Sequence, residues 1–159
     1  MIRSRAAGDL SACMATLRVV HEADGYPLNW PADPPAWLTP PGLRGAWVAV
    51  EGETITGHAI VTGDGELSRL FVSPQRRGTG LARELIAHAR AAHDGPLVLE
   101  VANAAAAAYY ERTGWMFTGS AVADWTAPDG SPVTLRRYRV AGQCSGPQAG
   151  GEGPRWEGR

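Results

Sequence analysis

The sequence predicts a mixed α/β protein, because strand-like and helix-like segments alternate along its first 140 residues. Its 159 residues fit one ordinary domain. Apolar residues make up 44% and charged residues 19%, which is a globular composition. We therefore expect a single domain over residues 1–140. Residues 141–159 are rich in Gly and Pro with almost nothing apolar to bury, so we expect a disordered tail there.

Charge and cysteine content argue against several function classes. The 15 basic and 16 acidic residues leave a net charge of −1, whereas nucleic-acid binding needs a strongly basic face. The two cysteines are Cys13 and Cys144, and no Cys/His cluster has metal-ligand spacing, so we expect no metal. No apolar run approaches the ~18 residues of a membrane span. These observations predict a reduced, cytoplasmic protein that binds neither nucleic acid nor membrane.

The first 42 residues predict a strand, a helix and a loop. Residues 1–7 are typical of a short strand, and Asp9 is a candidate N-cap for a helix that continues to about His21. Between residues 24 and 42, six prolines forbid long regular elements. This loop carries three large aromatic residues, Tyr26, Trp30 and Trp37. They either plug the loop onto the body of the protein or wall a substrate pocket, and the sequence leaves both interpretations open.

The rest of the domain predicts six strands and two helices. The strands are expected at residues 46–50, 55–61, 66–72, 97–101, 115–122 and 133–140. One helix is expected at residues 81–93, and a shorter one, capped by Asn103, continues to Arg112. Gly114 supplies the left-handed residue that closes the second helix.

The most informative segment joins the strand at 66–72 to the helix that begins at Leu81. Gly78 and Gly80 lie in this junction, where glycine lets the backbone approach a ligand closely. The unpaired N–H groups and the dipole of the helix's first turn favour a phosphate there. The spacing lacks the third glycine of the dinucleotide fingerprint, and the chain has no Lys, which a P-loop requires. The junction favours a phosphate or pyrophosphate, although a glycine pair alone is a weak signal.

Two separated motifs carry a family resemblance. Residues 77–82, Arg-Gly-Thr-Gly-Leu-Ala, match the Arg/Gln-x-x-Gly-x-Gly/Ala signature of the GNAT superfamily of acyl-CoA-dependent N-acetyltransferases. Residues 70–74 resemble the end of the family's preceding strand. Asn103, Tyr110 and the pair Gly114-Trp115 have the spacing of the family's second signature. The resemblance covers residues 44–122 closely and the first 43 loosely.

The resemblance implies a twisted mixed sheet of six or seven strands flanked by helices. Its fourth and fifth strands would splay apart to admit the pantetheine arm of acetyl-CoA, the co-substrate. The backbone of Leu70 and Val72 would pair with pantetheine, and the 77–82 loop would hold the pyrophosphate. Asn103 would hydrogen-bond the arm, or would only cap its helix. The residues assigned to the coenzyme are Leu70, Phe71, Val72, Arg77, Gly78, Thr79, Gly80, Leu81, Ala82, Asn103 and Tyr110.

Acetyl transfer to an amine needs groups that move protons. A protonated amine must lose a proton before it attacks a thioester, and the leaving thiolate is helped by an acid. The resemblance places Tyr110 beside the thioester sulfur as the general acid. Alternatively, Tyr110 is only an aromatic residue of the core. Its neighbour Tyr109 could be mistaken for it. Glu66 is the candidate base, with an ordinary solvated residue as the alternative. The other candidates for the base are His21, Glu22, Asp24, His58 and a chain of waters.

We therefore expect an N-acetyltransferase that moves an acetyl group from acetyl-CoA to a primary amine of a small molecule, by direct attack in a ternary complex. The loop after the first helix is expected to contact the acceptor, and its aromatic residues favour an apolar part. The residues assigned to the acceptor are Glu22, Asp24, Tyr26, Trp30 and Trp37. The alternatives are a protein or peptide N-acetyltransferase and a non-catalytic acyl-CoA sensor. A homodimer is left open.

Overall fold

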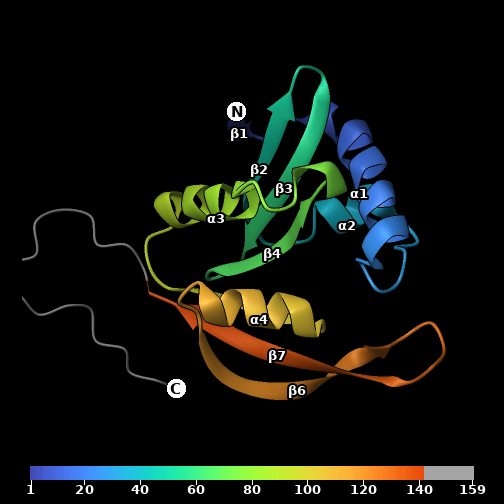
Figure 1. Ribbon diagram of the computed structural model, residues 1–159, viewed down its shortest axis with the longest axis vertical. Helices are drawn as coiled ribbons and strands as arrows, with labels where there is room; N and C mark the ends of the chain where they lie inside the picture. The colour runs from blue at the N-terminus through green and yellow to red at the C-terminus, as the bar shows by residue number, and fades with distance from the viewer. Residues whose placement is uncertain (142–159) are drawn as a thin grey trace, which may run out of the picture. The chain divides into compact units, whose positions relative to one another are not determined.

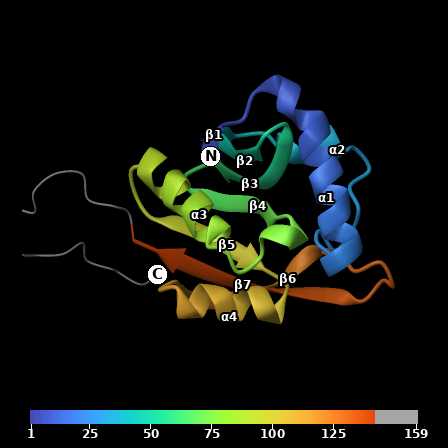
Figure 2. The same cartoon turned by 45° about the horizontal axis from the view of Figure 1, so that its top comes forward.

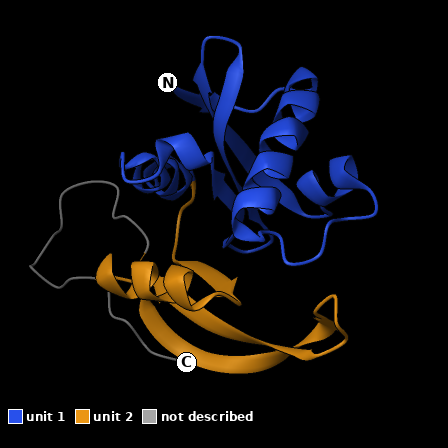
Figure 3. Cartoon of the chain, turned by 45° about the vertical axis from the view of Figure 1, so that its right-hand side comes forward, with its two compact units in different colours: residues 1–92 blue, residues 93–159 orange. Residues whose placement is uncertain are grey.

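Seven strands and four α-helices alternate along residues 1–141, the part of the chain that the computed structural model describes (Figure 1). The chain divides into two units, Met1–Ala92 and His93–Arg159 (Figure 3). Each unit has its own antiparallel strands, with three α-helices in the described residues of the first and one in those of the second. None of the helices in the described residues is both long and apolar enough to cross a membrane.

The first unit is a four-stranded antiparallel sheet with the strand order β1-β2-β3-β4. The strands are β1 (Ile2–Ser4), β2 (Leu43–Glu51), β3 (Thr54–Thr62) and β4 (Glu66–Val72). The helices are α1 (Leu10–Asp24), α2 (Pro34–Leu38) and α3 (Leu81–Ala92), with 3-10 turns at Ala7–Asp9 and Pro74–Arg76.

The helices α1 and α3 cover opposite faces of this sheet (Figure 2). Successive residues of a strand point to opposite faces. On β2, Val48 packs in one core cluster with Cys13 and Leu17 of α1. On β3, Gly57 lies against α3, where an added Cβ would come within 2.9 Å of Leu85 Cδ1. Helices therefore cover both faces of the sheet. A 3-10 turn and a glycine-containing loop connect β4 to α3.

The second unit is a three-stranded antiparallel sheet with the order β5-β7-β6 and one helix. Its elements are β5 (Leu97–Val101), α4 (Ala104–Arg112), β6 (Met116–Thr126) and β7 (Pro132–Val140). The Asn103 Oδ1 atom accepts the backbone N–H groups of Ala105 and Ala106 at 2.7 and 3.1 Å, which confirms it as the N-cap of α4.

The α/β class predicted from the sequence is confirmed, as are the predicted bounds of β4 and β5. The helix predicted to end at about His21 continues to Asp24, because no helix-breaking residue precedes Gly25, which adopts a left-handed φ of 71°. The first strand is shorter than predicted. Residues Ala7–Asp9 turn instead. Asp9 occupies the predicted N-cap position of α1, but its carboxylate makes no cap hydrogen bond and instead accepts the Ala6 N–H at 2.6 Å and pairs with Arg3 at 2.7 Å.

The proline-rich segment contains a short helix, α2, that the pattern did not predict. Asp33 Oδ1 accepts the Ala36 N–H at 3.2 Å, and proline occupies the first helical turn, where its missing N–H costs nothing. The predicted splay between β4 and β5 concerns strands of different units and stays a prediction, as does the single domain over residues 1–140. The tail predicted at residues 141–159, with Cys144, lies outside the described residues apart from Ala141.

Candidate active site

The junction between β4 and α3 has an open backbone. Gly78 and Gly80 adopt left-handed φ angles of 73° and 83°, and a Cβ added at either would meet no heavy atom within 4 Å. The Gly80 carbonyl accepts the first helical hydrogen bond, from the Glu84 N–H at 3.1 Å. The preceding N–H groups of a helix have no partner within it, and the helix dipole adds partial positive charge. This exposed loop is therefore suited to an anionic group such as a pyrophosphate.

Two arginines fix this loop to other elements of the first unit. Arg76 forms an ion pair with Glu51 at the end of β2, and Arg77 forms one with Asp24 at the end of α1. The hydrogen bond to Glu51 is the main cause that raises the pKa of Arg76. The Thr79 hydroxyl donates to the Arg76 carbonyl at 2.5 Å. Side-chain contacts thus fix the position of the loop, while the space beside its two glycines is free of other heavy atoms.

The strand β4 brings Leu70, Phe71 and Val72 to the start of this loop. Phe71 is buried and stacks on the His58 ring with centroids 5.0 Å apart, whereas Leu70 and Val72 are half-buried on the opposite face. His58 pairs with Phe71 and Ile60 with Ser68, so β4 has one residue more than β3 in this interval. The resulting bulge contains Arg69, a residue other than glycine that adopts a left-handed φ of 50°.

The aromatic residues of the proline-rich loop pack on the body of the first unit. Trp30 lies under the Arg18 guanidinium, 4.2 Å from its ring centroid, and beside His21. Trp37 lies 4.3 Å from the Arg69 guanidinium and contacts Tyr26 edge-on at 6.2 Å. Burial raises the pKa of Tyr26 to about 12. These contacts hold the loop onto α1 and β4, and its role in walling an acceptor pocket stays a prediction.

The candidate carboxylates of the first unit differ in their surroundings. Glu22 is exposed on α1, while Asp24 already has Arg77 as its partner. Glu66 is half-buried at the start of β4, opposite Thr62. Glu22 is therefore the more available carboxylate for an ammonium group, and the roles of all three stay predictions.

His58 does not fit the role of a base that the sequence left open for it. The side chain is fully buried, its Nε2 atom lies 2.8 Å from Arg5 Nη1, and its Nδ1 atom lies 2.9 Å from the Arg69 carbonyl. Because a guanidinium only donates, Nε2 accepts and Nδ1 carries the hydrogen. Sequence reasoning missed Arg5 and Arg69, since their contacts with Leu38, His58 and Trp37 span 11 to 53 residues of the chain.

The second unit holds the other two candidates, Asn103 and Tyr110, both on the α4 segment. Tyr110 is 7% exposed and packs edge-on against Trp115, with ring centroids 5.5 Å apart. Its neighbour Tyr109 is half-buried. The side-chain oxygen Oδ1 of Asn103 accepts the hydrogen bonds of the helix cap. The N–H groups of its side-chain amide are therefore the part that could donate to a ligand. The packing of Tyr110 is compatible with both interpretations of its role.

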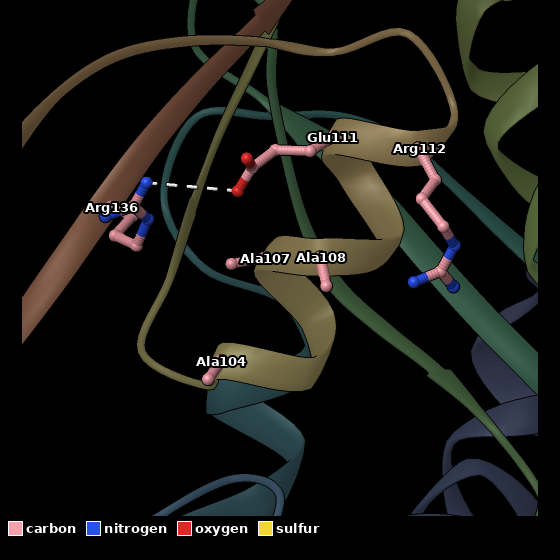
Figure 4. A pocket seen from close by; sticks show the side chains of 6 residues that line it. All are labelled: Ala104, Ala107, Ala108, Glu111, Arg112 and Arg136. Carbon is pink, nitrogen blue, oxygen red and sulfur yellow. Dashed lines mark ion pairs between the residues drawn. The ribbon is translucent and has the colours of Figure 1, made fainter.

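A hollow of about 530 Å³ lies beside α4 (Figure 4). It is lined by Ala104, Ala107, Ala108, Glu111, Arg112 and Arg136, and Glu111 pairs with Arg136 across it at 3.9 Å. None of these residues was assigned to the site from the sequence. Within residues 1–141, no group of three or more His, Cys, Asp or Glu side chains is placed to hold a metal ion.

Fold and loop geometry together define an α/β protein with an open, glycine-containing junction between a strand and a helix. The model of the acetyltransferase (GNAT) domain matches residues 43–116, which include this junction, Asn103 and Tyr110. Over these residues the chain is similar to the GNAT acetyltransferase domain, and the resemblance predicted from the sequence is confirmed.

Solved acetyltransferases share the fold over nearly the whole chain. The ribosomal-protein-S18-alanine N-acetyltransferase from Escherichia coli superposes with a TM-score of 0.71 at 22% identity, covering 92% of this chain and 96% of that one. The YncA protein from Salmonella typhimurium, solved with its cofactor acetyl-CoA, gives 0.67 at 22% identity over 94% and 98%. An aminoglycoside 6'-N-acetyltransferase complexed with coenzyme A gives 0.67 at 11% identity over 92% and 99%. No curated protein sequence matches this chain.

Proposed function

We propose that this chain is an acetyl-CoA-dependent N-acetyltransferase that acetylates a primary amine of a small molecule. The observation that carries the proposal is the open, left-handed glycine pair between β4 and α3 within a GNAT acetyltransferase domain. Structural relatives solved with acetyl-CoA or coenzyme A support the choice of co-substrate. The proposed reaction needs no metal, and we expect it in the cytoplasm.

The glycine loop and β4 would bind the co-substrate. N–H groups of residues 77–82 would hold its pyrophosphate at the helix N-terminus. The backbone of Leu70 and Val72 would pair with the pantetheine arm, and the Asn103 amide would donate to it. Acetyl-CoA supplies the activated acyl group, so the protein has to orient it and move protons.

The amine would attack the thioester directly, with Glu66 or a water accepting its proton and Tyr110 donating one to the leaving thiolate. A covalent acyl-enzyme is disfavoured by the chemistry of Cys13. This thiol is buried, and burial raises its pKa to about 11, so at neutral pH it is a poor nucleophile.

The acceptor would lie against the loop after α1, where Glu22 is exposed at the end of the helix and Tyr26, Trp30 and Trp37 supply apolar surface. Asp24 would act together with Arg77 rather than alone. A heavily cationic acceptor would need more carboxylates than this loop offers, so an amine with an apolar or aromatic part fits best.

The test has two stages. Isothermal titration of acetyl-CoA into the full chain should show saturable binding, and no binding would overturn the assignment. A library of small amines and short peptides, followed by coenzyme A release, should then give turnover with small amines. Turnover confined to peptides would make the chain a protein N-acetyltransferase, and binding without turnover of any amine would make it an acyl-CoA sensor.

A further inference from the structure

A hydrogen-bonded network inside the first unit has His58 at its centre. This ring is fully buried and makes hydrogen bonds through both nitrogens, accepting from Arg5 at 2.8 Å and donating to the Arg69 carbonyl at 2.9 Å. Burial, together with the nearby arginines, lowers the pKa of His58 to about 4, so the ring is neutral at physiological pH. The two bonds fix one tautomer, with the hydrogen on Nδ1.

The Arg5 side of the network reaches the end of α2. Arg5 Nη1 also donates to the Leu38 carbonyl at 2.7 Å, and Nη2 donates to the Thr39 hydroxyl at 2.7 Å. These partners are all neutral, and burial lowers the pKa of Arg5. Arg5 is half-buried, and its hydrogen bonds join His58 to the end of α2.

The Arg69 side of the network reaches the same loop from the sheet. The backbone of Arg69 forms the bulge of β4, and His58 holds its carbonyl. Its side chain donates from Nε to the Trp37 carbonyl at 3.1 Å and lies over the Trp37 ring at 4.3 Å. Residues 37–39 therefore accept hydrogen bonds from both Arg5 and Arg69. His58 is hydrogen-bonded to both arginines.

We propose that His58 is a positioning residue that couples the bulge of β4 to the segment at α2. This inference rests on the proposed function, in which the backbone after the bulge binds the pantetheine arm and the α2 segment faces the acceptor. The coupling fixes the position of Leu70 and Val72 relative to Trp37 through hydrogen bonds to both ring nitrogens.

Two isosteric variants separate the two hydrogen bonds. In His58→Asn the amide nitrogen occupies the place of Nδ1, so the donor to the Arg69 carbonyl is kept and the acceptor for Arg5 is lost. In His58→Gln the amide oxygen can occupy the place of Nε2, so the acceptor is kept and the donor is lost. Both variants lose the ring stack on Phe71, so each is the packing control for the other.

The readouts are amide hydrogen exchange of residues 34–42 and 68–72 and the dissociation constant of acetyl-CoA. For His58→Gln we expect faster exchange at 68–72 and about fivefold weaker acetyl-CoA binding, the usual worth of one hydrogen bond. For His58→Asn we expect faster exchange at 34–42 with acetyl-CoA binding nearly unchanged. If both variants loosen both segments equally and weaken binding equally, His58 is only a core residue. If the unsubstituted chain binds no acetyl-CoA, the proposed function fails, while the exchange pattern still decides the coupling.

Discussion

Asp24, at the end of α1, forms an ion pair with Arg77 in the glycine loop. The sequence assigned these two residues to different ligands, Asp24 to the acceptor amine and Arg77 to the coenzyme. Their side chains are 30% and 50% exposed, respectively, so water screens the pair and it contributes little to stability. Its consequence is electrostatic, because the Asp24 carboxylate neutralises a positive charge beside the proposed pyrophosphate site.

Asp24→Asn should tighten acetyl-CoA binding by about threefold at low ionic strength, since one negative charge near an anionic ligand is removed. The gain should fade as salt is added. The free energy of unfolding should change by less than about 1 kcal/mol. Titration calorimetry at two salt concentrations checks the first effect and urea unfolding the second.

Glu22→Gln is the matched control, because it removes the same charge from the same helix at an exposed position outside the ion pair. If both variants bind acetyl-CoA more tightly by the same factor, the effect comes from the net charge of the protein and not from the ion pair. No gain in Asp24→Asn would mean that Arg77 does not face the coenzyme.

Gly80→Asp should abolish acetyl-CoA binding in a folded protein. The substitution puts a carboxylate where we place the pyrophosphate, at a φ of 83° that Asp and Asn tolerate better than other residues with a side chain, and into space with no heavy atom within 4 Å. Gly80→Asn has the same shape and backbone strain without the charge. We expect binding at least about tenfold weaker in the Asp variant than in the Asn variant, an electrostatic difference near 1.4 kcal/mol. Equal acetyl-CoA affinities of the two variants would contradict the assignment of the pyrophosphate to this loop.

Local signals in the sequence predicted the elements that carry the proposed coenzyme site. The turn before Glu66 and Pro74 after Val72 delimit β4, and Asn103 marks the start of α4. Each of these signals acts within a few residues of the element it delimits. The α2 helix also has local signals, the Asp33 cap and the prolines behind it, and the number of prolines in the segment obscured them.

The Arg5–His58–Arg69 network was beyond prediction because most of its partners are distant in sequence. Arg5 meets Leu38 and His58 from 33 and 53 residues away, and these contacts arise only when β1, β3 and α2 come together. Periodicity shows that β3 is buried, but it gives no indication of which polar side chain meets a buried histidine. The same limit applied to Asp24, whose pairing with Arg77 changed its expected role.

Burial of neutral His58 should make the protein less stable as the pH falls from 6.5 to about 4. The folded-state pKa is about 4 and the ordinary value is 6.5, so in this window the unfolded chain binds a proton that the folded one does not. Arg5 and Arg69 face the ring, and protonation would place three positive charges together. The full shift corresponds to about 3 kcal/mol in the free energy of unfolding.

Urea unfolding at pH 7.5, 6.5, 5.5 and 4.5 measures this effect. His58→Asn and His58→Gln should be less stable at pH 7.5 and should lack that part of the slope. Asp9, whose pKa the Arg3 hydrogen bond lowers to about 2, loses its contribution only below this window. A slope in the variants as steep as in the unsubstituted chain would assign the titration to other groups.

Tyr110→Phe should lower kcat by roughly 10²–10⁴ and leave the dissociation constant of acetyl-CoA nearly unchanged. As a general acid the hydroxyl acts when the thiolate leaves and contributes little when the coenzyme binds. Phe keeps the ring that packs on Trp115, so lost packing cannot explain a lost rate. Steady-state kinetics with an amine from the library, beside titration calorimetry, separates the two quantities. Tyr109→Phe is the matched control, since it deletes the same atom from the adjacent, more exposed residue. A rate within a few-fold of the unsubstituted chain in Tyr110→Phe would make this residue a core aromatic, and a larger loss in Tyr109→Phe would move the acid to its neighbour.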